Sequence, residues 1–209
     1  MSVLRFDEAT HRYWVGDMEI PSVTQIIKQQ GLMKGEGFFT KRGRERGAAV
    51  HMACALLAWD NLDWTSVDDE IKPYVESYGL FKEATKLKPR RTEFMFWHPR
   101  LLFAGTWDQD FDCQTIQDVL VDLKSGGPQK TDGVQTAMYQ EGALANHIRI
   151  QHRAGLYLQP DGSIAKLREY KDANDLKIGL CALRLCQEEE KFQQVCAPYR
   201  ENIRRWMEA

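Results

Sequence analysis

Asp122 and Lys124 are the residues of this chain whose types and spacing most clearly suggest chemistry. They stand two residues apart at the end of the apolar run Val119-Leu120-Val121, and Ser125-Gly126-Gly127-Pro128 ends that run. Side chains at i and i+2 of a β-strand share a face, so Asp122 and Lys124 project together while Leu123 points into the core. Burying such a pair is costly unless it is paired or binds an ion. The pattern predicts either an ion-binding site or a strand-end salt bridge.

The segment before this strand supplies a second carboxylate. Three aspartates occupy every second position there: Asp108, Asp110 and Asp112. A hairpin through Cys113-Gln114-Thr115 would bring one of them beside Asp122. We favour Asp108, because it lies deepest in the apolar stretch, and we expect the other two to be solvated near the turn. Carboxylate oxygens next to a lysine suit Mg²⁺ or Mn²⁺ better than zinc.

A histidine lies on a helical run further upstream. The residues from Arg46 to Leu57 are apolar nearly all round, which predicts a buried helix. His51 on this helix is either a core residue or a metal ligand. Gly47, one turn before His51, would let the helix pack tightly or leave space beside the imidazole. Gly105, upstream of the first aspartate, would let another backbone approach closely.

A polar helix face follows the two strands. Thr131 or Asp132 can serve as the N-cap of a helix that runs to about Asn146. Gln135 and Tyr139 stand at i and i+4, so they share one face of that helix. The alternative is an ordinary amphipathic helix whose tyrosine packs on the core.

In combination, these pieces resemble the RecB-type branch of the PD-(D/E)xK nuclease superfamily. That branch includes the RecB nuclease domain, the mitochondrial genome maintenance exonuclease, CRISPR-associated RecB-like exonucleases and many phage exonucleases. Its motif order is Gly-x-x-x-His, Gly-x-x-Asp, Asp-x-Lys and Gln-x-x-x-Tyr. The chain matches that order at Gly47/His51, Gly105/Asp108, Asp122/Lys124 and Gln135/Tyr139, and the resemblance covers most of residues 1–170.

The resemblance implies a role for each matched residue. His51, Asp108 and Asp122 would bind the metal together with the Leu123 carbonyl oxygen. Lys124 would position or polarise the attacking water. Two further sets are implied: Gln135 and Tyr139 would orient the nucleic-acid strand, and Glu93 would be either an auxiliary acid or an exposed strand carboxylate.

The implied fold is α/β (α+β) with a restriction-endonuclease-like core, in which helices flank a central mixed sheet, plus an N-terminal hairpin and helical additions. We expect a single nuclease domain over residues 1–209, with core motifs at about 40–147 and a helical C-terminal extension at about 172–208. The sequence pattern predicts the following further elements: strands at 4–6, 13–15 and 91–97, helices at 22–30, 38–59 and 68–86, a link at 31–37, and a hairpin of 152–158 with 165–170.

The implied activity is that of a Mg²⁺-dependent deoxyribonuclease, with Mn²⁺ as a substitute. We expect an exonuclease of phage type that acts on single-stranded or end-containing DNA in recombination or DNA processing, with a recombination annealing protein as a candidate partner. Two alternatives stay open: a structure-specific or restriction-like endonuclease on the same core, and a catalytically inactive nucleic-acid-binding relative.

The overall composition fits a globular protein. A hydrophobic content of 43% in 209 residues is enough for a sizeable core. We expect a cytoplasmic protein, in a bacterial host cell if phage-encoded, because no apolar run is long enough for a membrane span and the first residues do not resemble a signal peptide. The five cysteines include no Cys-x-x-Cys pair, so we expect no iron–sulfur cluster.

The net charge of −2 argues against tight, non-specific DNA binding over a whole face. Basic residues nevertheless gather in two segments, 41–46 and 86–91. Arg42 and Arg44 in the first segment are candidate DNA contacts, because they lead into the His51 helix. The alternative for both segments is ordinary solvated charge.

Overall fold

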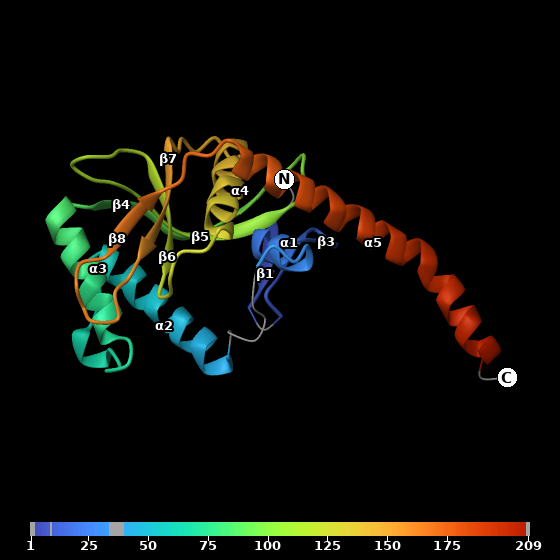
Figure 1. The fold of residues 1–209 in the computed structure, drawn as a ribbon, viewed down its shortest axis with the longest axis horizontal. Helices are drawn as coiled ribbons and strands as arrows, with labels where there is room; N and C mark the ends of the chain where they lie inside the picture. Colours follow the sequence, from blue (N-terminus) through green and yellow to red (C-terminus); the bar gives the residue numbers. More distant parts are fainter. Residues whose placement is uncertain (1–2, 9, 34–39, 208–209) are drawn as a thin grey trace.

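The computed structural model describes residues 3–8, 10–33 and 40–207, with side chains to residue 191. Its centre is a five-stranded sheet (Figure 1), whose strands in spatial order are β4 (Lys88–Trp97), β5 (Ala104–Asp112), β6 (Val119–Lys124), β7 (His152–Tyr157) and β8 (Lys166–Glu169). The pairs β4–β5, β5–β6 and β7–β8 are antiparallel, whereas β6 and β7 are parallel. The mixed sheet expected from the sequence is confirmed.

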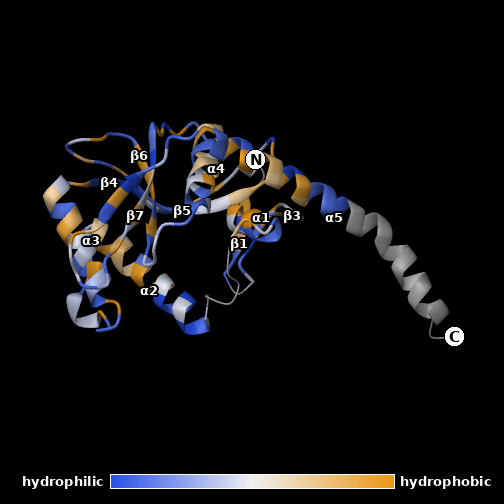
Figure 2. Cartoon of the chain, in the orientation of Figure 1, coloured by the Kyte–Doolittle hydropathy of each residue, from blue (hydrophilic) through white to orange (hydrophobic). Residues whose placement is uncertain are grey.

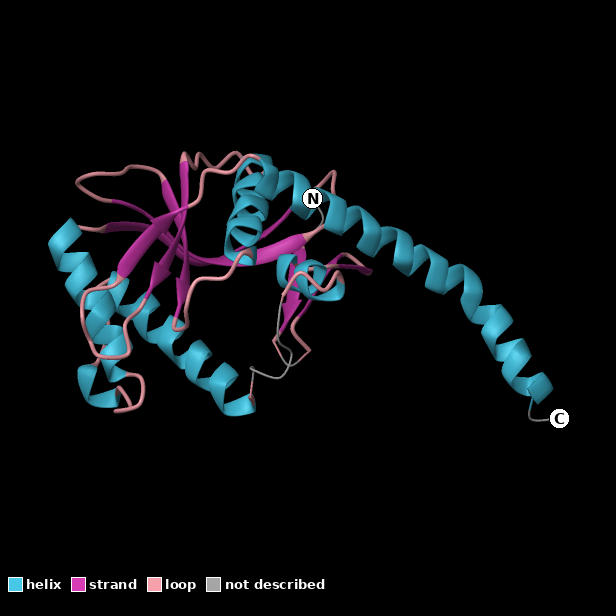
Figure 3. Cartoon of the chain, viewed as in Figure 1, coloured by secondary structure: helices cyan, strands magenta, loops and turns pink. Residues whose placement is uncertain are grey.

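Helices cover both faces of this sheet (Figure 3). On one face lie α2 (Lys41–Ala58) and α3 (Lys72–Thr85), and on the other lie α1 (Val23–Gln29), α4 (Thr131–Ala145) and the first part of α5 (Asn174–Met207). Helix α4 is the crossover between β6 and β7, as a parallel strand pair requires.

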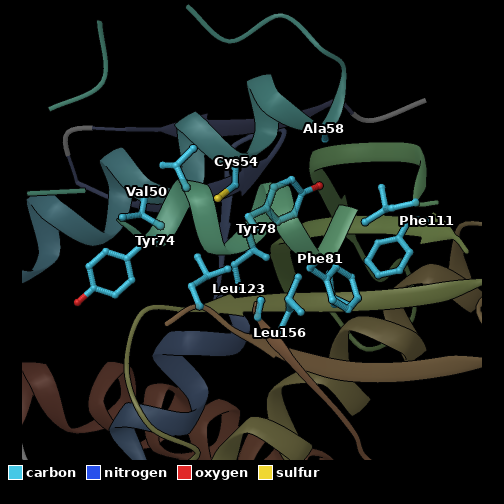
Figure 4. Packing of buried hydrophobic residues seen from close by; sticks show 14 of the residues in the cluster. Val50, Cys54, Ala58, Tyr74, Tyr78, Phe81, Phe111, Leu123 and Leu156 are labelled. Atoms are coloured by element: carbon cyan, nitrogen blue, oxygen red, sulfur yellow. The ribbon is translucent and has the colours of Figure 1, made fainter. Parts of the chain in front are cut away.

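Strand β6 separates two hydrophobic cores. Val119, Val121 and Leu123 point into the core beneath α2 and α3, where Figure 4 shows Leu123 near Val50 and Tyr74. Leu120 points the other way, into the core beneath α4. All of these side chains are essentially inaccessible to solvent. A strand buried on both faces reads as a continuous apolar run, which explains this stretch of the sequence.

The N-terminal region forms a separate three-stranded sheet of β1 (Leu4–Asp7), β2 (Arg12–Val15) and β3 (Met18–Ile20). The first two strands were predicted, whereas β3 was not. Ser22 then caps α1 through a capping box, because its hydroxyl accepts from the Gln25 amide while the Gln25 side chain accepts from the Ser22 amide. Ala104 N–H donates to the Pro21 carbonyl at 3.0 Å, which fixes this region to the start of β5.

Two expectations about the helices are wrong, and one about a link cannot be compared with the structure. Helix α4 has Lys130 at its N-cap, without a side-chain capping bond, so neither Thr131 nor Asp132 is the cap. Helix α2 is not buried all round: Met52 and Leu56 are exposed, and Figure 2 shows a hydrophilic first turn. The predicted link at 31–37 lies mostly outside the described residues.

Residues 174–207 form one helix, where the sequence left one or two open. Within the described residues, no helix combines the length and apolar character needed to span a bilayer.

Candidate active site

A cleft of about 660 Å³ lies between the N-terminal hairpin, α2, strands β4 to β6 and α4. Its lining includes every polar residue that the motifs single out: His51, Glu93, Asp108, Asp122, Lys124, Gln135 and Tyr139. These residues come from five different elements of the chain. The fold therefore gathers side chains that lie up to 88 positions apart, from residue 51 to residue 139, around one solvent-accessible space.

The β5–β6 hairpin delivers the two aspartates. Gln109 pairs with Val121 and Asp110 pairs with Leu120, so the same register places Asp108 across from Asp122. Both side chains are buried, and the Leu123 N–H donates to Asp108 Oδ2 at 2.6 Å. This backbone bond holds the Asp108 carboxylate at the strand end without neutralising its charge.

Helix α2 and strand β4 bring two further potential ligands to Asp108. His51 Nδ1 lies 3.2 Å from Asp108 Oδ1. One ligand atom each from His51, Glu93 and Asp108 falls within 4.8 Å of the other two. Glu93 has a left-handed backbone with φ of 48°, which is costly for a residue with a side chain. Within the described part of the chain, this is the one group of three or more histidine, cysteine or acidic side chains close enough to share an ion.

The pKa values in the cleft reflect an excess of negative charge. Burial by itself lowers the pKa of His51, but Asp108, assisted by Asp122 and Glu93, raises it to about 9. Burial and the Asp108 charge raise the pKa of Glu93 to about 7. Burial likewise raises the pKa of Asp122 to about 6, although Lys124 counteracts it. The folded protein thus retains protons here that free carboxylates and imidazoles would lose.

Asp122 carries a further sign of incomplete compensation. Lys124 Nζ lies 2.5 Å from Asp122 Oδ2, which is an ion-pair contact. Asp122 Oδ2 is buried, and the Lys124 ammonium is the charge that faces it. Lys124 is shared with Asp132, so the carboxylates of the cleft outnumber the cations beside them. Burying this excess negative charge is costly, and binding a divalent cation would offset the cost. The donor set of one imidazole and hard carboxylate oxygens fits Mg²⁺ or Mn²⁺.

Lys124 is held on its other side by α4. Its ammonium donates to Gln135 Oε1 at 2.9 Å and lies 3.5 Å from Asp132 Oδ1. Burial would lower the pKa of Lys124, but Asp122 and Asp132 raise it, so the side chain is cationic. Asp132 in turn accepts from the Tyr157 hydroxyl at 2.6 Å. The lysine is thereby positioned by three polar side chains.

Asp132 is the site residue that the sequence reasoning missed, since it was considered only as an N-cap. Its Oδ2 accepts from the Gln129 N–H at 2.8 Å, and Tyr157 also contacts the Tyr170 hydroxyl. Strand β7 pairs with β6 so that Tyr157 lies beside Lys124. The signal available in the sequence was the position of Asp132 one helical turn before Gln135, on the same face of the helix.

Gln135 and Tyr139 line the cleft and also form a hydrogen bond with each other. Gln135 Nε2 donates to the Tyr139 hydroxyl at 2.9 Å. Tyr139 is buried, and its ring packs edge-on against Phe96 with centroids 5.9 Å apart. The core-packing alternative therefore describes the Tyr139 ring, while its hydroxyl extends the polar chain that starts at Lys124.

Gly105 acts differently from expectation, whereas Gly47 fits one of its two expected roles. A Cβ at Gly105 would lie 2.9 Å from the Phe96 ring and 3.0 Å from the Tyr139 ring, so aromatic side chains, not a backbone, make the close approach. A Cβ at Gly47 would meet nothing within 4 Å. Open space beside α2 agrees with the second reading of Gly47, and tight helix packing does not explain it.

The basic segments contribute little free positive charge to the cleft. Arg42 pairs with Glu70 at 2.8 Å and does not line the cleft. Arg44 is exposed on α2 and does not line the cleft either, although it lies two turns before His51 on the same side of the helix. In the second segment, Arg90 and Arg91 are engaged by carboxylates of β5 and the β5–β6 turn.

Asp110 and Asp112 are not both solvated, contrary to expectation. Asp110 is fully buried, and it accepts from Arg91 Nη1 at 2.7 Å and from Trp107 Nε1 at 3.0 Å. Asp112 is half-buried, and its Oδ1 accepts from the Asp118 N–H at 2.8 Å. The pairing of β4 with β5 places Arg91 opposite Asp110, which explains how the carboxylate is accommodated.

A larger cleft, of about 950 Å³, lies between α4, the start of β7, β8 and the start of α5. Most of the charged side chains that line it form ion pairs. Arg153 contacts Asp175 at 2.9 Å, and His152 contacts Glu169 at 2.7 Å. The smaller cleft is therefore the better candidate for chemistry, because its charges are not balanced.

The cysteines are dispersed through the described residues. Cys54 and Cys113 lie in the core beneath α2 and α3, Cys186 lies in the other core, and Cys181 is exposed.

Comparisons with known proteins give the following result. No family model matches this sequence, and no curated protein matches it. Among solved structures, the chain is similar to an alkaline exonuclease, LHK-Exo, from Laribacter hongkongensis, with 11% identity, a TM-score of 0.45, and coverage of 86% of this chain and 93% of that one. LHK-Exo in complex with dAMP gives 12% identity, a TM-score of 0.42, and coverage of 87% and 94%. At TM-scores below 0.5, these neighbours indicate nothing about the activity or the site residues of this chain.

Proposed function

We propose that this protein is a divalent-metal-dependent DNA nuclease that hydrolyses phosphodiester bonds in the cleft between α2 and the β5–β6 hairpin. The observation that carries the proposal is the donor cluster: one ligand atom each of His51, Glu93 and Asp108 lies within 4.8 Å of the others, beside the buried Asp122 carboxylate. A divalent cation would complete this cluster, and Lys124 stands next to it.

The roles combine what the motif resemblance implies with the contacts of each side chain. His51, Asp108 and Asp122 would hold the cation, with the Leu123 carbonyl as a further ligand and Glu93 as an auxiliary acid. When bound, the cation supplies charge neutralisation and Lewis acidity at the phosphodiester.

Lys124 would stabilise the negative charge that grows on the phosphoryl oxygens. Its ammonium is already fixed by Asp122, Asp132 and Gln135, so little reorganisation is needed as that charge develops. The Gln135 side chain therefore positions the Lys124 ammonium. The Tyr139 hydroxyl holds the Gln135 side chain by accepting a hydrogen bond from its amide nitrogen.

The finer assignment is an exonuclease on single-stranded or end-containing DNA, of phage type, in recombination or DNA processing. Support for it comes from the motif order in the sequence. On this proposal Mg²⁺ is the metal in use and Mn²⁺ substitutes for it. Arg44, on the same side of α2 as His51, is better placed than Arg42 to meet a phosphate outside the cleft. A recombination annealing protein and a cytoplasmic location belong to the same proposal.

The decisive experiment compares end-labelled linear DNA with covalently closed circular DNA, with Mg²⁺, Mn²⁺, Ca²⁺ or EDTA. We expect Mg²⁺ and Mn²⁺ to support loss of the linear label, Ca²⁺ and EDTA to support none, and the circle to persist. The Asp122→Asn variant, purified in the same way, controls for contaminating nucleases.

Three outcomes would contradict parts of the proposal. Vigorous cleavage in EDTA would exclude the metal-dependent mechanism. Cutting of the circle at discrete sites would favour an endonuclease. DNA binding without cleavage under every metal condition would identify an inactive relative.

A further inference from the structure

The N-terminal hairpin forms an aromatic wall of the cleft. Phe6, His11 and Tyr13 all line it. The centroid of the Phe6 ring lies 4.7 Å from that of Tyr13 and 5.1 Å from that of His11. Phe6 and Tyr13 are cross-strand partners in the β1–β2 register, so both rings belong to the same face of the hairpin.

This wall is fixed next to the donor cluster. Tyr13 is 2% exposed, and its hydroxyl hydrogen-bonds Thr106 Oγ1 at 2.9 Å. Thr106 precedes Asp108 by two positions on β5, and both line the same cleft. Phe6 is half-buried and His11 is exposed, so these two rings present free surface while Tyr13 anchors them.

Two methionines add apolar surface to the same cleft from other elements. Met52 on α2 is 59% exposed and Met95 on β4 is 49% exposed, and both line the cleft. Met52 follows His51 directly, and Met95 lies two positions after Glu93. Thioether side chains are flexible and polarisable, and they contact aromatic rings favourably.

The charges of the hairpin indicate what this wall can contact. Glu8 lines the cleft, and no described residue of the hairpin that lines it is a lysine or arginine. The hairpin arginines are engaged elsewhere: Arg5 stacks over Trp14 with 4.5 Å between its guanidinium carbon and the ring centroid, and Arg12 pairs with Glu19 at 3.2 Å. On this side of the cleft a phosphate would be repelled by Glu8 and would find no lysine or arginine among the hairpin residues that line it, whereas a flat, uncharged ring would find stacking surface.

We propose that an unpaired nucleobase, belonging to a nucleotide next to the scissile phosphate, stacks on Phe6 and His11, with Met52 and Met95 completing its apolar surroundings. The inference rests on the proposed nuclease function and names its substrate as an unpaired strand or frayed end. A base in an intact duplex is already stacked and paired, so it would have to be extruded before it could bind. Aromatic stacking tolerates any base, so the site would select for strand state rather than for sequence.

The test measures binding to single-stranded oligonucleotides that carry one abasic position. Fluorescence anisotropy in Ca²⁺ compares an intact oligonucleotide with versions that lack the base at the first, second or third nucleotide from the end. We expect one position at which removal of the base weakens binding by about tenfold, the effect of one base–aromatic stack. Phe6→Ala should abolish that difference, and Phe6→Tyr should keep it.

Trp14→Ala is the matched control. Trp14 and Arg5 are the cross-strand pair adjacent to Phe6 and Tyr13, on the other face of the hairpin, and Trp14 does not line the cleft. This variant should keep the full difference between intact and abasic strands. If Phe6→Ala does not fold, Met52→Ala from α2 replaces it in the same comparison.

The outcomes separate this inference from the proposed function. Equal weakening of intact and abasic strands by Phe6→Ala, or no base-dependent position at all, would overturn the base site. Mg²⁺-dependent cleavage that persists in that case would leave the nuclease proposal intact. Base-dependent binding without cleavage would overturn the nuclease proposal and retain the base site.

Discussion

Strands β4, β5 and β6 carry two charged clusters that differ in one respect. The arginine cluster consists of three guanidinium groups and three carboxylates, each carboxylate within 4.0 Å of a guanidinium nitrogen: Arg90, Arg91, Arg149, Asp110, Asp112 and Asp118. The cleft cluster consists of His51, Glu93, Asp108, Asp122 and Lys124, where three carboxylates meet one lysine and one imidazole. The first cluster is electrostatically complete, and the second is completed by an added cation.

The comparison shows that the balance between buried carboxylates and nearby cations distinguishes a structural cluster from a candidate functional one. Burying carboxylates is expensive, and a structural cluster offsets that cost with cations from its own chain. In the cleft cluster a neighbouring carboxylate adds to the cost, because both burial and the Asp108 charge raise the pKa of Glu93. Burial also raises the pKa of Asp110 in the arginine cluster, but there Arg91 and Arg90 counteract it. Perturbed pKa values cluster at functional sites, so the excess of carboxylates in a cleft is the stronger indication of function.

The largest effect should come from Asp122→Asn. Asparagine keeps the shape of the side chain but removes the charge that a cation needs, so we expect Mg²⁺-dependent cleavage to fall by at least about 10³-fold. The melting temperature of the metal-free protein should fall by only a few degrees, because Lys124 loses one charged partner but keeps Asp132 and Gln135. Initial rates and thermal melts of the same preparation measure both. Cleavage near the wild-type rate would remove Asp122 from the site.

Lys124→Met should lose about 10² to 10³-fold in rate, while the Mg²⁺ concentration for half-maximal activity changes little. The reason is that the ammonium acts on charge that develops in the transition state, whereas the cation is held by other groups. Lys82→Met is the matched control, because Lys82 pairs with Asp60 and the Leu57 carbonyl away from the cleft. A rate close to wild type for Lys124→Met would show that the lysine serves only as a salt bridge.

Asp110→Asn tests the arginine cluster in the opposite sense. We expect a loss of about 2–3 kcal/mol in the free energy of unfolding, because Arg91 loses a charged partner and one donor is left facing another. Activity per folded molecule should remain, since Asp110 does not line the cleft. Urea unfolding and rates at low denaturant are the measurements. A variant that is fully stable and inactive would reverse the assignment of the two clusters.

The sequence predicted the features that depend on local pattern. The apolar run of β6, its glycine-rich end and the turn at 113–115 were enough to place Asp108 beside Asp122. The short helix capped by Ser22 was likewise visible, because a capping box is a local signature.

The features that were not predicted depend on partners that are distant in the chain. Burial of Asp110 requires Arg91, and that contact is created by the β4–β5 register. The support of Lys124 by Asp132 requires Tyr157, which arrives through the parallel pairing of β6 with β7. The spacing of residues within one segment cannot predict contacts with a strand that is distant in the sequence.

The smallest effects concern how the stability of the metal-free protein depends on pH. The cleft cluster should lose stability as the pH rises, and the arginine cluster should lose stability as the pH falls. The pKa of His51 is raised from 6.5 to about 9, so its stabilising protonated form is complete below about pH 6.5 and lost as the pH rises toward 9. The Gln151 amide and Arg90 lower the pKa of Asp118, so its contribution is complete above the ordinary carboxyl range and lost as the pH falls below it. Melting temperature should therefore decline by a few degrees in both directions.

Two variants separate the alkaline decline in melting temperature from the acid decline. His51→Gln should flatten the decline above pH 6.5, and Asp118→Asn should flatten the acid decline. Saturating Mg²⁺ should also reverse the alkaline decline in the wild type, because a cation binds the deprotonated donors and its affinity rises with pH. If Mg²⁺ raised the melting temperature equally at pH 6 and pH 8.5, metal binding would not displace protons. The cation would then lie outside the cleft cluster.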